Sequence, residues 1–149
     1  HFQGVFIMTA KTTAELMNEL MKANNIGDYL KENSRYMVSG ELPAYLSNIL
    51  EKKGLVKSSV IKKTELSEIT GYQIFSGVRN PSRESLICIC RAMELDVDET
   101  QYLLRIGGFA ELYPKNKRDA IIIKGIASKL SVAKINENLY DNGEDTLNK

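Results

Sequence analysis

The sequence predicts an all-α fold, and three observations support this prediction. Apolar residues recur at helical spacing along almost the whole chain of 149 residues. Strand signals are scarce by comparison. Near its end the chain repeats an amphipathic helical hairpin, so one helical unit is used twice. We therefore expect one ordinary domain, or a small helical domain with an extension.

The composition excludes several classes of protein. No apolar run reaches the roughly 18 residues that span a bilayer, and nothing resembles a secretory signal. We therefore expect a cytoplasmic protein with no membrane partner. The first residues, His1 to Gly4, have the form of an affinity-tag remnant after protease cleavage. Residues 1–7 are interpreted as this remnant, and Met8 as the native start.

The chain offers little for catalysis or metal binding. His1 is the only histidine and belongs to the tag remnant. Cys88 and Cys90 lie two residues apart in an apolar helical run, and residues at that spacing do not face each other. They are expected to be buried thiols in a reducing compartment. With no Gly-rich phosphate loop or nucleophile–base set, we expect no enzyme, no metal and no cofactor.

The N-terminal segment, residues 8–41, is predicted to form short helices. Thr13 is placed to cap the first helix, which Asn24 and Asn25 end. A second stretch of helix is expected from Ile26 to Asn33. The apolar residues of the first helix are Leu16, Leu20 and Met21.

The middle of the chain, residues 42–112, begins with a helix that has Pro43 in its first turn. Gly54 is placed where a left-handed residue ends that helix. A short helix is then expected over residues 57–64, with a tight turn near Glu65. Leu46, Ile49 and Leu50 are expected to face inward.

A further short helix follows this turn. Ser67 is placed to cap it and Gly77 to end it. The next helix begins after Ser82, with Ser85 at the position where a complete capping box has Glu or Gln. Its inward positions are Leu86, Ile89, Cys90 and Met93.

The stretch from Gly77 to Leu86 reads Gly-Val-Arg-Asn-Pro-Ser-Arg-Glu-Ser-Leu. It resembles the Gly-x-Arg-x-Pro-Ser-x-x-x-Leu signature of the repressor-like (Cro/C1, XRE-type) helix-turn-helix family. The resemblance extends without a gap over about Leu42 to Leu95. It implies a helix-turn-helix whose second helix lies in the DNA major groove.

The resemblance implies which residues contact DNA. Lys57, at the start of the first short helix, and the loop residues Arg79 and Asn80 are expected to hold phosphates. Ser67, Glu68, Ile69, Thr70 and Gln73 are expected on the exposed side of the second helix.

Base reading is assigned to the second helix. Gln73 can bond adenine through two atoms, and Glu68 can accept from cytosine. Ile69 or the Thr70 methyl group can contact a thymine methyl. Phe75 is expected in the core.

Three features favour the alternative that this fold binds a protein, as an adaptor or antitoxin-like subunit. Gly71 stands where the family has a buried aliphatic residue, and Ile61 stands where it has alanine. The packing of the two helices is therefore expected to be wider, although Gly71 can also mark a close approach. The second helix carries no Lys or Arg. Residues 42–95 nevertheless carry eight basic and five acidic residues, whereas the segments on either side are each acidic by one charge.

Residues 83–112 align with residues 118–147 after a shift of 35 positions, with eight identities in thirty. This repeat predicts that residues 113–149 form a second helical hairpin packed on the first.

The combined prediction is a sequence-specific regulator that binds duplex DNA as a homodimer. Its dimer surface is expected either on the N-terminal helices or on Leu139 and Tyr140 of the second hairpin.

Overall fold

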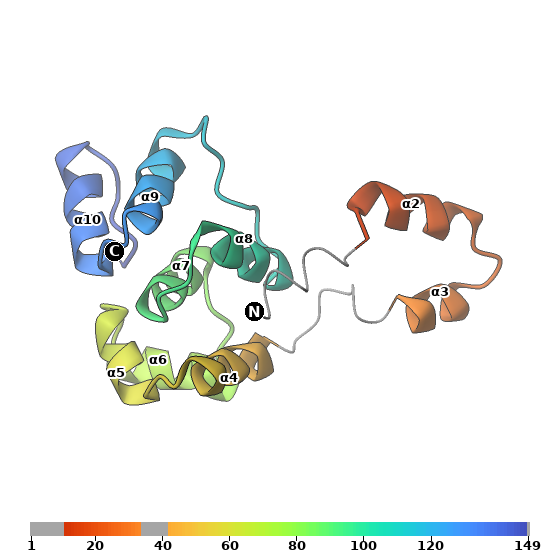
Figure 1. Ribbon diagram of the computed structural model, residues 1–149, viewed down its shortest axis with the longest axis horizontal. Coiled ribbons are helices and arrows are strands. Elements are labelled where there is room, and N and C mark those ends of the chain that lie inside the picture. The colour runs from red at the N-terminus through yellow and green to blue at the C-terminus, as the bar shows by residue number, and fades with distance from the viewer. Residues whose placement is uncertain (1–10, 34–41, 149) are drawn as a thin grey trace. The chain divides into compact units, whose positions relative to one another are not determined.

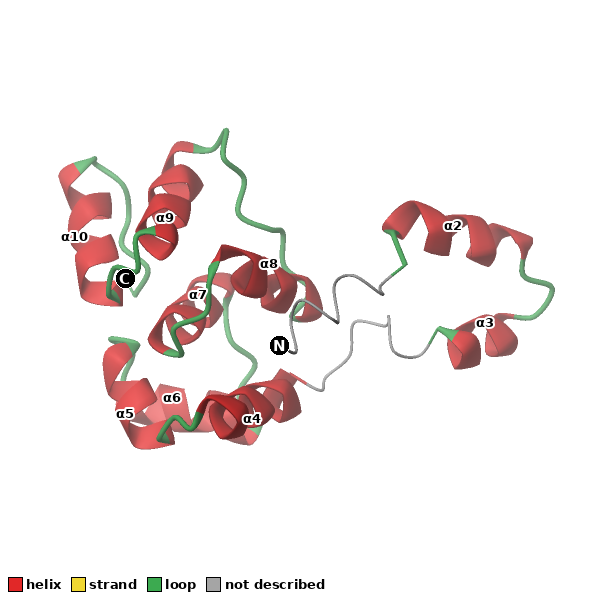
Figure 2. Cartoon of the chain, viewed as in Figure 1, coloured by secondary structure: helices red, strands yellow, loops and turns green. Residues whose placement is uncertain are grey.

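A computed structural model describes residues 11–33 and 42–148, and every regular element within those ranges is a helix (Figures 1 and 2). The predicted all-α class is confirmed for this part of the chain. The tag remnant, residues 1–7, and Met8 lie outside it. The chain forms two compact units, His1–Val38 and Ser39–Lys149. Within the described ranges, no helix combines the length and the apolar character needed to cross a membrane.

The first unit contains helices α2 (Thr13–Lys22) and α3 (Ile26–Glu32). Thr12 caps α2, because its backbone is extended and its side chain accepts from the backbone N–H of Glu15 at 3.1 Å. The prediction that Thr13 is the cap was wrong by one residue, since Thr13 is already helical. Asn25 caps α3 by accepting from the N–H groups that follow it.

Polar contacts of one lysine join α2 to the end of α3 in the first unit. Lys11 Nζ donates to the Glu19 carboxylate at 2.7 Å and to the Asn33 side chain at 2.9 Å. The hydrogen bond from Lys11 lowers the pKa of Glu19. Neither helix contains a buried residue. The two helices therefore lack a core of their own.

The second unit begins with α4 (Leu42–Lys53), α5 (Lys57–Lys63) and α6 (Glu68–Ser76), and α6 contacts both of the others. Pro43 lies in the first turn of α4, where its missing N–H costs nothing. Gly54 follows α4 with a φ of +65°, as the pattern predicts.

Helix α7 (Arg83–Ala92) lies between these three helices and the C-terminal pair, α9 (Lys117–Ala127) and α10 (Val132–Asp141) (Figure 1). It contacts α5, α10 and the helix that follows it, α8 (Val97–Ile106). Ser82 caps it by accepting from Ser85 N at 3.1 Å, as predicted. Every residue from Leu86 to Met93 is buried, so this helix is the centre of the core. Cys88 and Cys90 are free, buried thiols within it.

The predicted repeat reappears in the backbone. Helices α8 (Val97–Ile106) and α10 (Val132–Asp141) begin and end 35 residues apart, while α9 (Lys117–Ala127) corresponds to α7. Glu94 and Lys129, also 35 apart, both have positive φ angles. Strained left-handed positions at equivalent sites indicate the same chain path in both hairpins.

The two hairpins are joined by reciprocal ion pairs. Arg83 contacts Asp119 at 3.0 Å, and Arg118 contacts Glu84 at 3.3 Å. Residues 83 and 118 are equivalent in the repeat, as are residues 84 and 119. The hairpins therefore contact each other as the two halves of a two-fold symmetric interface do.

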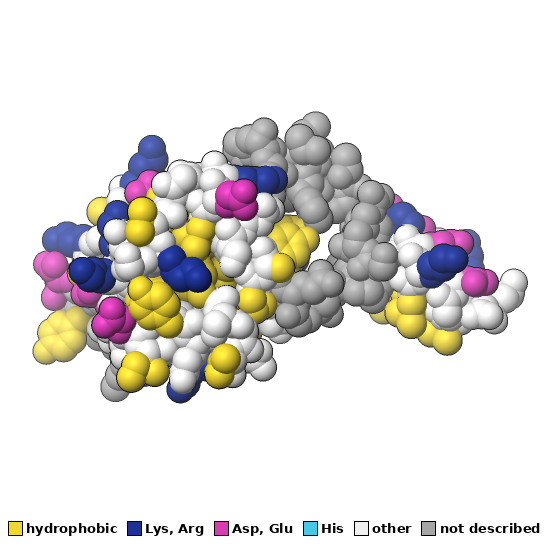
Figure 3. Space-filling view, turned by 90° about the horizontal axis from the view of Figure 1, so that it is seen from below, with side chains coloured by type: hydrophobic (Ala, Val, Ile, Leu, Met, Phe, Trp, Pro, Cys, Tyr) yellow, Lys and Arg dark blue, Asp and Glu magenta, His cyan; other side chains and the backbone are white. Residues whose placement is uncertain are grey.

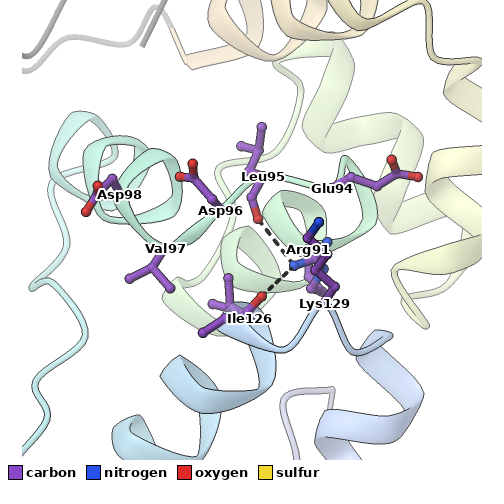
Figure 4. Close-up of a pocket in the computed structure, with 9 residues that line it drawn as sticks. Arg91, Glu94, Leu95, Asp96, Val97, Asp98, Ile126 and Lys129 are labelled. Carbon is purple, nitrogen blue, oxygen red and sulfur yellow. Dashed lines mark hydrogen bonds between the residues drawn. The ribbon is translucent and has the colours of Figure 1, made fainter. Parts of the chain in front are cut away.

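Arg91 connects the carboxyl ends of α7 and α9 (Figure 4). Its side chain lies in a cleft of about 520 Å³, and the residue is only 8% exposed. Its Nη1 donates to the backbone oxygens of Leu95 at 3.4 Å and Ile126 at 3.1 Å. Burial lowers the pKa of Arg91, while nearby Glu94 opposes that shift. Ile126 lies in the last turn of α9, so the guanidinium faces the partial negative charge at the end of that helix.

Candidate nucleic-acid interface

A tight turn joins α5 to α6. The Thr64 hydroxyl donates to Ile61 O at 2.6 Å and accepts from Leu66 N at 3.2 Å, which closes the end of α5. Glu65 then adopts a φ of +63°, as a sharp turn requires. Ser67 begins α6 by accepting from Thr70 N at 3.1 Å, and so the predicted cap is confirmed.

Helices α5 and α6 approach each other closely at Ile61 and Gly71. A Cβ atom added to Gly71 would lie 2.6 Å from Ile61 Cγ2, much closer than real Cβ contacts. The expectation of wider packing was wrong, because the hydrogen of Gly71 leaves room for the larger Ile61 side chain. The two unusual residues are therefore complementary.

Helix α6 has a buried side and an exposed side. Gly71, Ile74 and Phe75 are buried, so the prediction that Phe75 belongs to the core is confirmed. All eight residues predicted to contact DNA lie at least partly at the surface. Thr70 and Gln73 are half-buried, whereas Lys57, Ser67, Glu68, Ile69, Arg79 and Asn80 are exposed.

Gln73 and Arg79 form a pair at the end of α6. Arg79 Nε donates to Gln73 Oε1 at 2.9 Å. The backbone N–H groups of Val78 and Arg79 both donate to Gln73 O, which folds the loop back against the helix. Gly77 makes this reversal with a φ of +85°. The bond from Arg79 orients the Gln73 amide, a relationship that spacing along the sequence did not reveal.

The Ser67 and Thr70 side chains form a hydrogen bond with each other. Ser67 Oγ donates to Thr70 Oγ1 at 2.8 Å while it accepts the Thr70 backbone N–H. Ser67 therefore serves first as a helix cap. At the start of α5, Lys57 Nζ lies 6.0 Å from the centre of the Phe75 ring, which places its charge next to the C-terminal half of α6.

Basic residues are few around α5 and α6. Helix α6 contains no Lys or Arg, and the neighbouring basic side chains come from α5 and from Arg79. Figure 3 shows dark blue side chains scattered over the visible face, with apolar groups between them. Three further exposed apolar residues lie in or next to these two helices, and the resemblance did not imply them as contacts: Val56, Tyr72 and Val78.

The second hairpin reaches the turn between α5 and α6. Asn148 Nδ2 donates to the backbone oxygen of Glu65 at 3.1 Å, although 83 residues separate them. Asn136 holds this end of the chain by bonding both Leu147 N and the Asn148 side chain. The only signal in the sequence that this end of the chain is ordered was the repeat, because its alignment extends to Leu147. Nothing in the sequence indicated the contact with Glu65.

No group of three or more His, Cys, Asp or Glu side chains in the described ranges could hold a metal ion. No protein-family model, curated protein or solved structure matches the chain. The candidate site is therefore defined by its geometry: two short helices in close contact, an oriented amide, and lysine and arginine side chains around it.

Proposed function

We propose that this chain is a sequence-specific regulator that binds duplex DNA through a repressor-like helix-turn-helix made of α5 and α6. The observation that carries the proposal is the pair formed by Gln73 and Arg79. An oriented amide on the exposed side of a short helix can read the major-groove edge of a base.

In the proposed complex, α6 lies in the major groove. The Gln73 amide nitrogen donates to adenine N7, and its oxygen uses its second lone pair to accept from adenine N6. Arg79 Nε continues to hold that oxygen. The two terminal nitrogens of Arg79 are then directed to a phosphate, together with Lys57 and Asn80.

The remaining contacts follow from the exposed side chains. Ile69 is 72% exposed, and it can pack against a thymine methyl group. Glu68 lies in the first turn of α6 and can accept from cytosine N4. The proposed regulator is a homodimer, because one such helix reads only a few base pairs and two half-sites give specificity.

A protein-binding adaptor is the second candidate function. Exposed Ile69, Tyr72 and Val78 with no basic residue on α6 favour it, since apolar side chains and few charges are typical of protein contacts. The two functions differ in salt dependence. DNA affinity falls steeply with salt because bound phosphates release counterions, whereas contact between apolar surfaces does not.

The test begins by selecting bound sequences from a random duplex pool and measuring affinity against salt concentration. Lys57→Ala should lower affinity for all duplexes and reduce the salt slope by about one. Lys124→Ala, an exposed lysine on α9, is the matched control and should leave the slope unchanged. Recovery of no preferred sequence, or equal slopes for both variants, would reject the proposed site.

A further inference from the structure

One side of the described part of the first unit, helices α2 and α3, is apolar and exposed. Eleven large hydrophobic side chains are exposed in the described ranges, and five of them belong to α2 and α3, which together have only 17 residues. These five define the apolar face discussed below: Met17, Leu20, Met21, Ile26 and Leu30. In Figure 3 the hydrophobic side chains of this unit gather on one side.

The charged residues of the two helices lie on the other side. At 100° per residue, Glu15, Glu19 and Lys22 point away from the apolar positions of α2. Helix α3 has the same arrangement, with its charged residues opposite Ile26 and Leu30. Both helices therefore present an apolar stripe with no charged residue in it.

This unit needs a partner surface to be stable. Helix α2 has 10 residues and α3 has 7, whereas isolated helices shorter than about 12–15 residues are marginal in water. Neither contains a buried residue, so the packing of α2 against α3 cannot supply the missing stability. Covering the apolar face can supply it.

We propose that a second copy of this chain covers the face, so that α2 and α3 of two chains form a four-helix bundle. Antiparallel helical hairpins with one apolar side are the halves of such bundles. The homodimer belongs to the proposed function, on which this assignment of its surface rests.

The area of the face suits a homodimer. From their exposed fractions, the five side chains present roughly 500 Å² of accessible surface. A stable interface buries about 800 Å² on each partner, and about 65% of it is apolar in homodimers. The available apolar area therefore matches what a standard dimer requires.

Other occupants fit this face less well. Anionic membrane surfaces bind helices with basic polar faces, but α2 and α3 carry four carboxylates and two lysines. In the second unit, four of the six exposed large hydrophobic residues belong to the α5–α6 region that is proposed to bind DNA. The described residues of that unit therefore form no separate apolar face of similar size.

The second hairpin fits the dimer surface less well than the sequence suggested. Leu139 is fully buried in the core, so its predicted role at an interface was wrong. Tyr140 is 76% exposed, but the only other exposed large hydrophobic side chain in the described part of that hairpin is Tyr113. Tyr140 is consequently a suitable control position.

The test measures the mass of the full chain in solution by light scattering, without DNA. The unmodified protein should have the mass of two chains. Leu20→Glu combined with Met17→Glu should reduce it to that of one chain, because each charge would be buried in the bundle. Tyr140→Glu should remain dimeric. A single-chain mass for the unmodified protein, or a dimer that survives the double substitution, overturns the proposal.

Cross-linking provides a second measurement that does not depend on disrupting the hairpin. Met21→Cys should give linked dimers with a short bismaleimide, whereas Tyr140→Cys should not. Cys88 and Cys90 are fully buried and should contribute no background. Linked dimers from the Tyr140 variant alone would assign the interface to the other hairpin and refute this one.

The same variants separate this inference from the proposed function. A monomeric Leu20→Glu, Met17→Glu protein should still bind a single half-site in a Gln73-dependent way, with weaker binding to the paired site. If the chain is dimeric through α2 and α3 but binds no DNA, the surface assignment stands and the proposed function fails. If the chain binds half-sites but never dimerises, DNA binding stands and the assignment of the dimer surface fails.

Discussion

Ile61 of α5 fills the space that a side chain at Gly71 of α6 would need, with only 2.6 Å between Ile61 Cγ2 and the position of a Cβ atom on Gly71. Gly125 and Ile135 have the same relationship between α9 and α10, at 2.5 Å from Ile135 Cγ1. In both pairs a glycine inside a helix allows close packing against a branched side chain. The close approach of α5 and α6 therefore depends on the pair and not on either residue alone.

Gly71→Ala is expected to destabilise the protein, although alanine usually stabilises a helix by about 1 kcal/mol relative to glycine. The added methyl group overlaps Ile61, and such overpacking typically costs about 1–3 kcal/mol. Ile61→Ala removes the two Cγ atoms that overlap the new methyl group, so it should cost less in the Gly71→Ala background than in the unmodified protein. Urea denaturation of the single and double variants measures this coupling. Simple additivity of the two changes would contradict the proposed contact.

Gln73→Ala should reduce affinity for the selected DNA site by roughly 1–3 kcal/mol, with little loss on random DNA. Folding should barely change, because substitutions of this kind at the surface usually cost under about 0.5 kcal/mol. A loss of several degrees in thermal stability would instead show that Gln73 is structural. If neither stability nor site preference changed, the adaptor function would be favoured.

Arg79→Ala should weaken binding to all duplexes and also reduce discrimination at the base read by Gln73. The first effect follows from a lost phosphate contact, and the second from the lost hydrogen bond that orients the amide. In a double-mutant cycle with Gln73→Ala, the two changes should therefore be non-additive for the preferred site and additive for random DNA. If the two changes were additive for the preferred site as well as for random DNA, Arg79 would not orient the Gln73 amide.

Asp119→Ala should lower the free energy of unfolding by about 2–3 kcal/mol. The Asp119 carboxylate accepts from Arg83 at 3.0 Å and from Tyr113 N at 3.0 Å, and its side chain is only 10% exposed. Glu111→Ala is the matched control. Its ion pair with Arg105 is 46% exposed on both sides, so the cost should stay below about 1 kcal/mol. Equal costs in denaturation experiments would count against a structural role for the reciprocal pairs.

Cys88 and Cys90 should be unreactive towards thiol reagents near neutral pH in the folded protein and reactive after unfolding. Burial raises the pKa of Cys88 from its ordinary value of 9.0 to about 12, and it raises the pKa of Cys90 as well. Stopped-flow labelling with a coloured disulfide reagent, with and without urea, measures this difference. Rapid labelling of the native protein would contradict the buried position of α7.

The same pKa shifts predict how stability depends on pH. Above about pH 9 the unfolded thiols lose protons that the folded thiols keep, so the free energy of unfolding should fall as pH rises towards 12. Below pH 9 this contribution is fully present. Replacing both cysteines by alanine should flatten this decline in urea denaturation series between about pH 9 and 10, up to the ordinary tyrosine pKa of about 10. If the free energy of unfolding fell as steeply with pH after this replacement, the raised pKa values of the two thiols would be contradicted.

Local chemistry explains why much of the helical pattern could be read from the sequence. Ser67 and Ser82 bond to backbone groups three residues away, and Gly54 and Gly77 tolerate a positive φ that other residues avoid. These signals act within one or two turns of chain. The 35-residue repeat likewise showed that one hairpin recurs, since equivalent residues meet equivalent local requirements.

Contacts between distant residues were decided by the tertiary structure. Spacing could not show that Gly71 accommodates Ile61, that Arg79 orients Gln73, or that Asn148 bonds the turn at Glu65. An amphipathic pattern shows that a residue such as Leu139 is apolar, but only packing decides whether another helix or another molecule covers it. The sequence by itself determined the helices and the repeat because these depend on neighbouring residues. The geometry of the candidate site depends on side chains that only folding brings together.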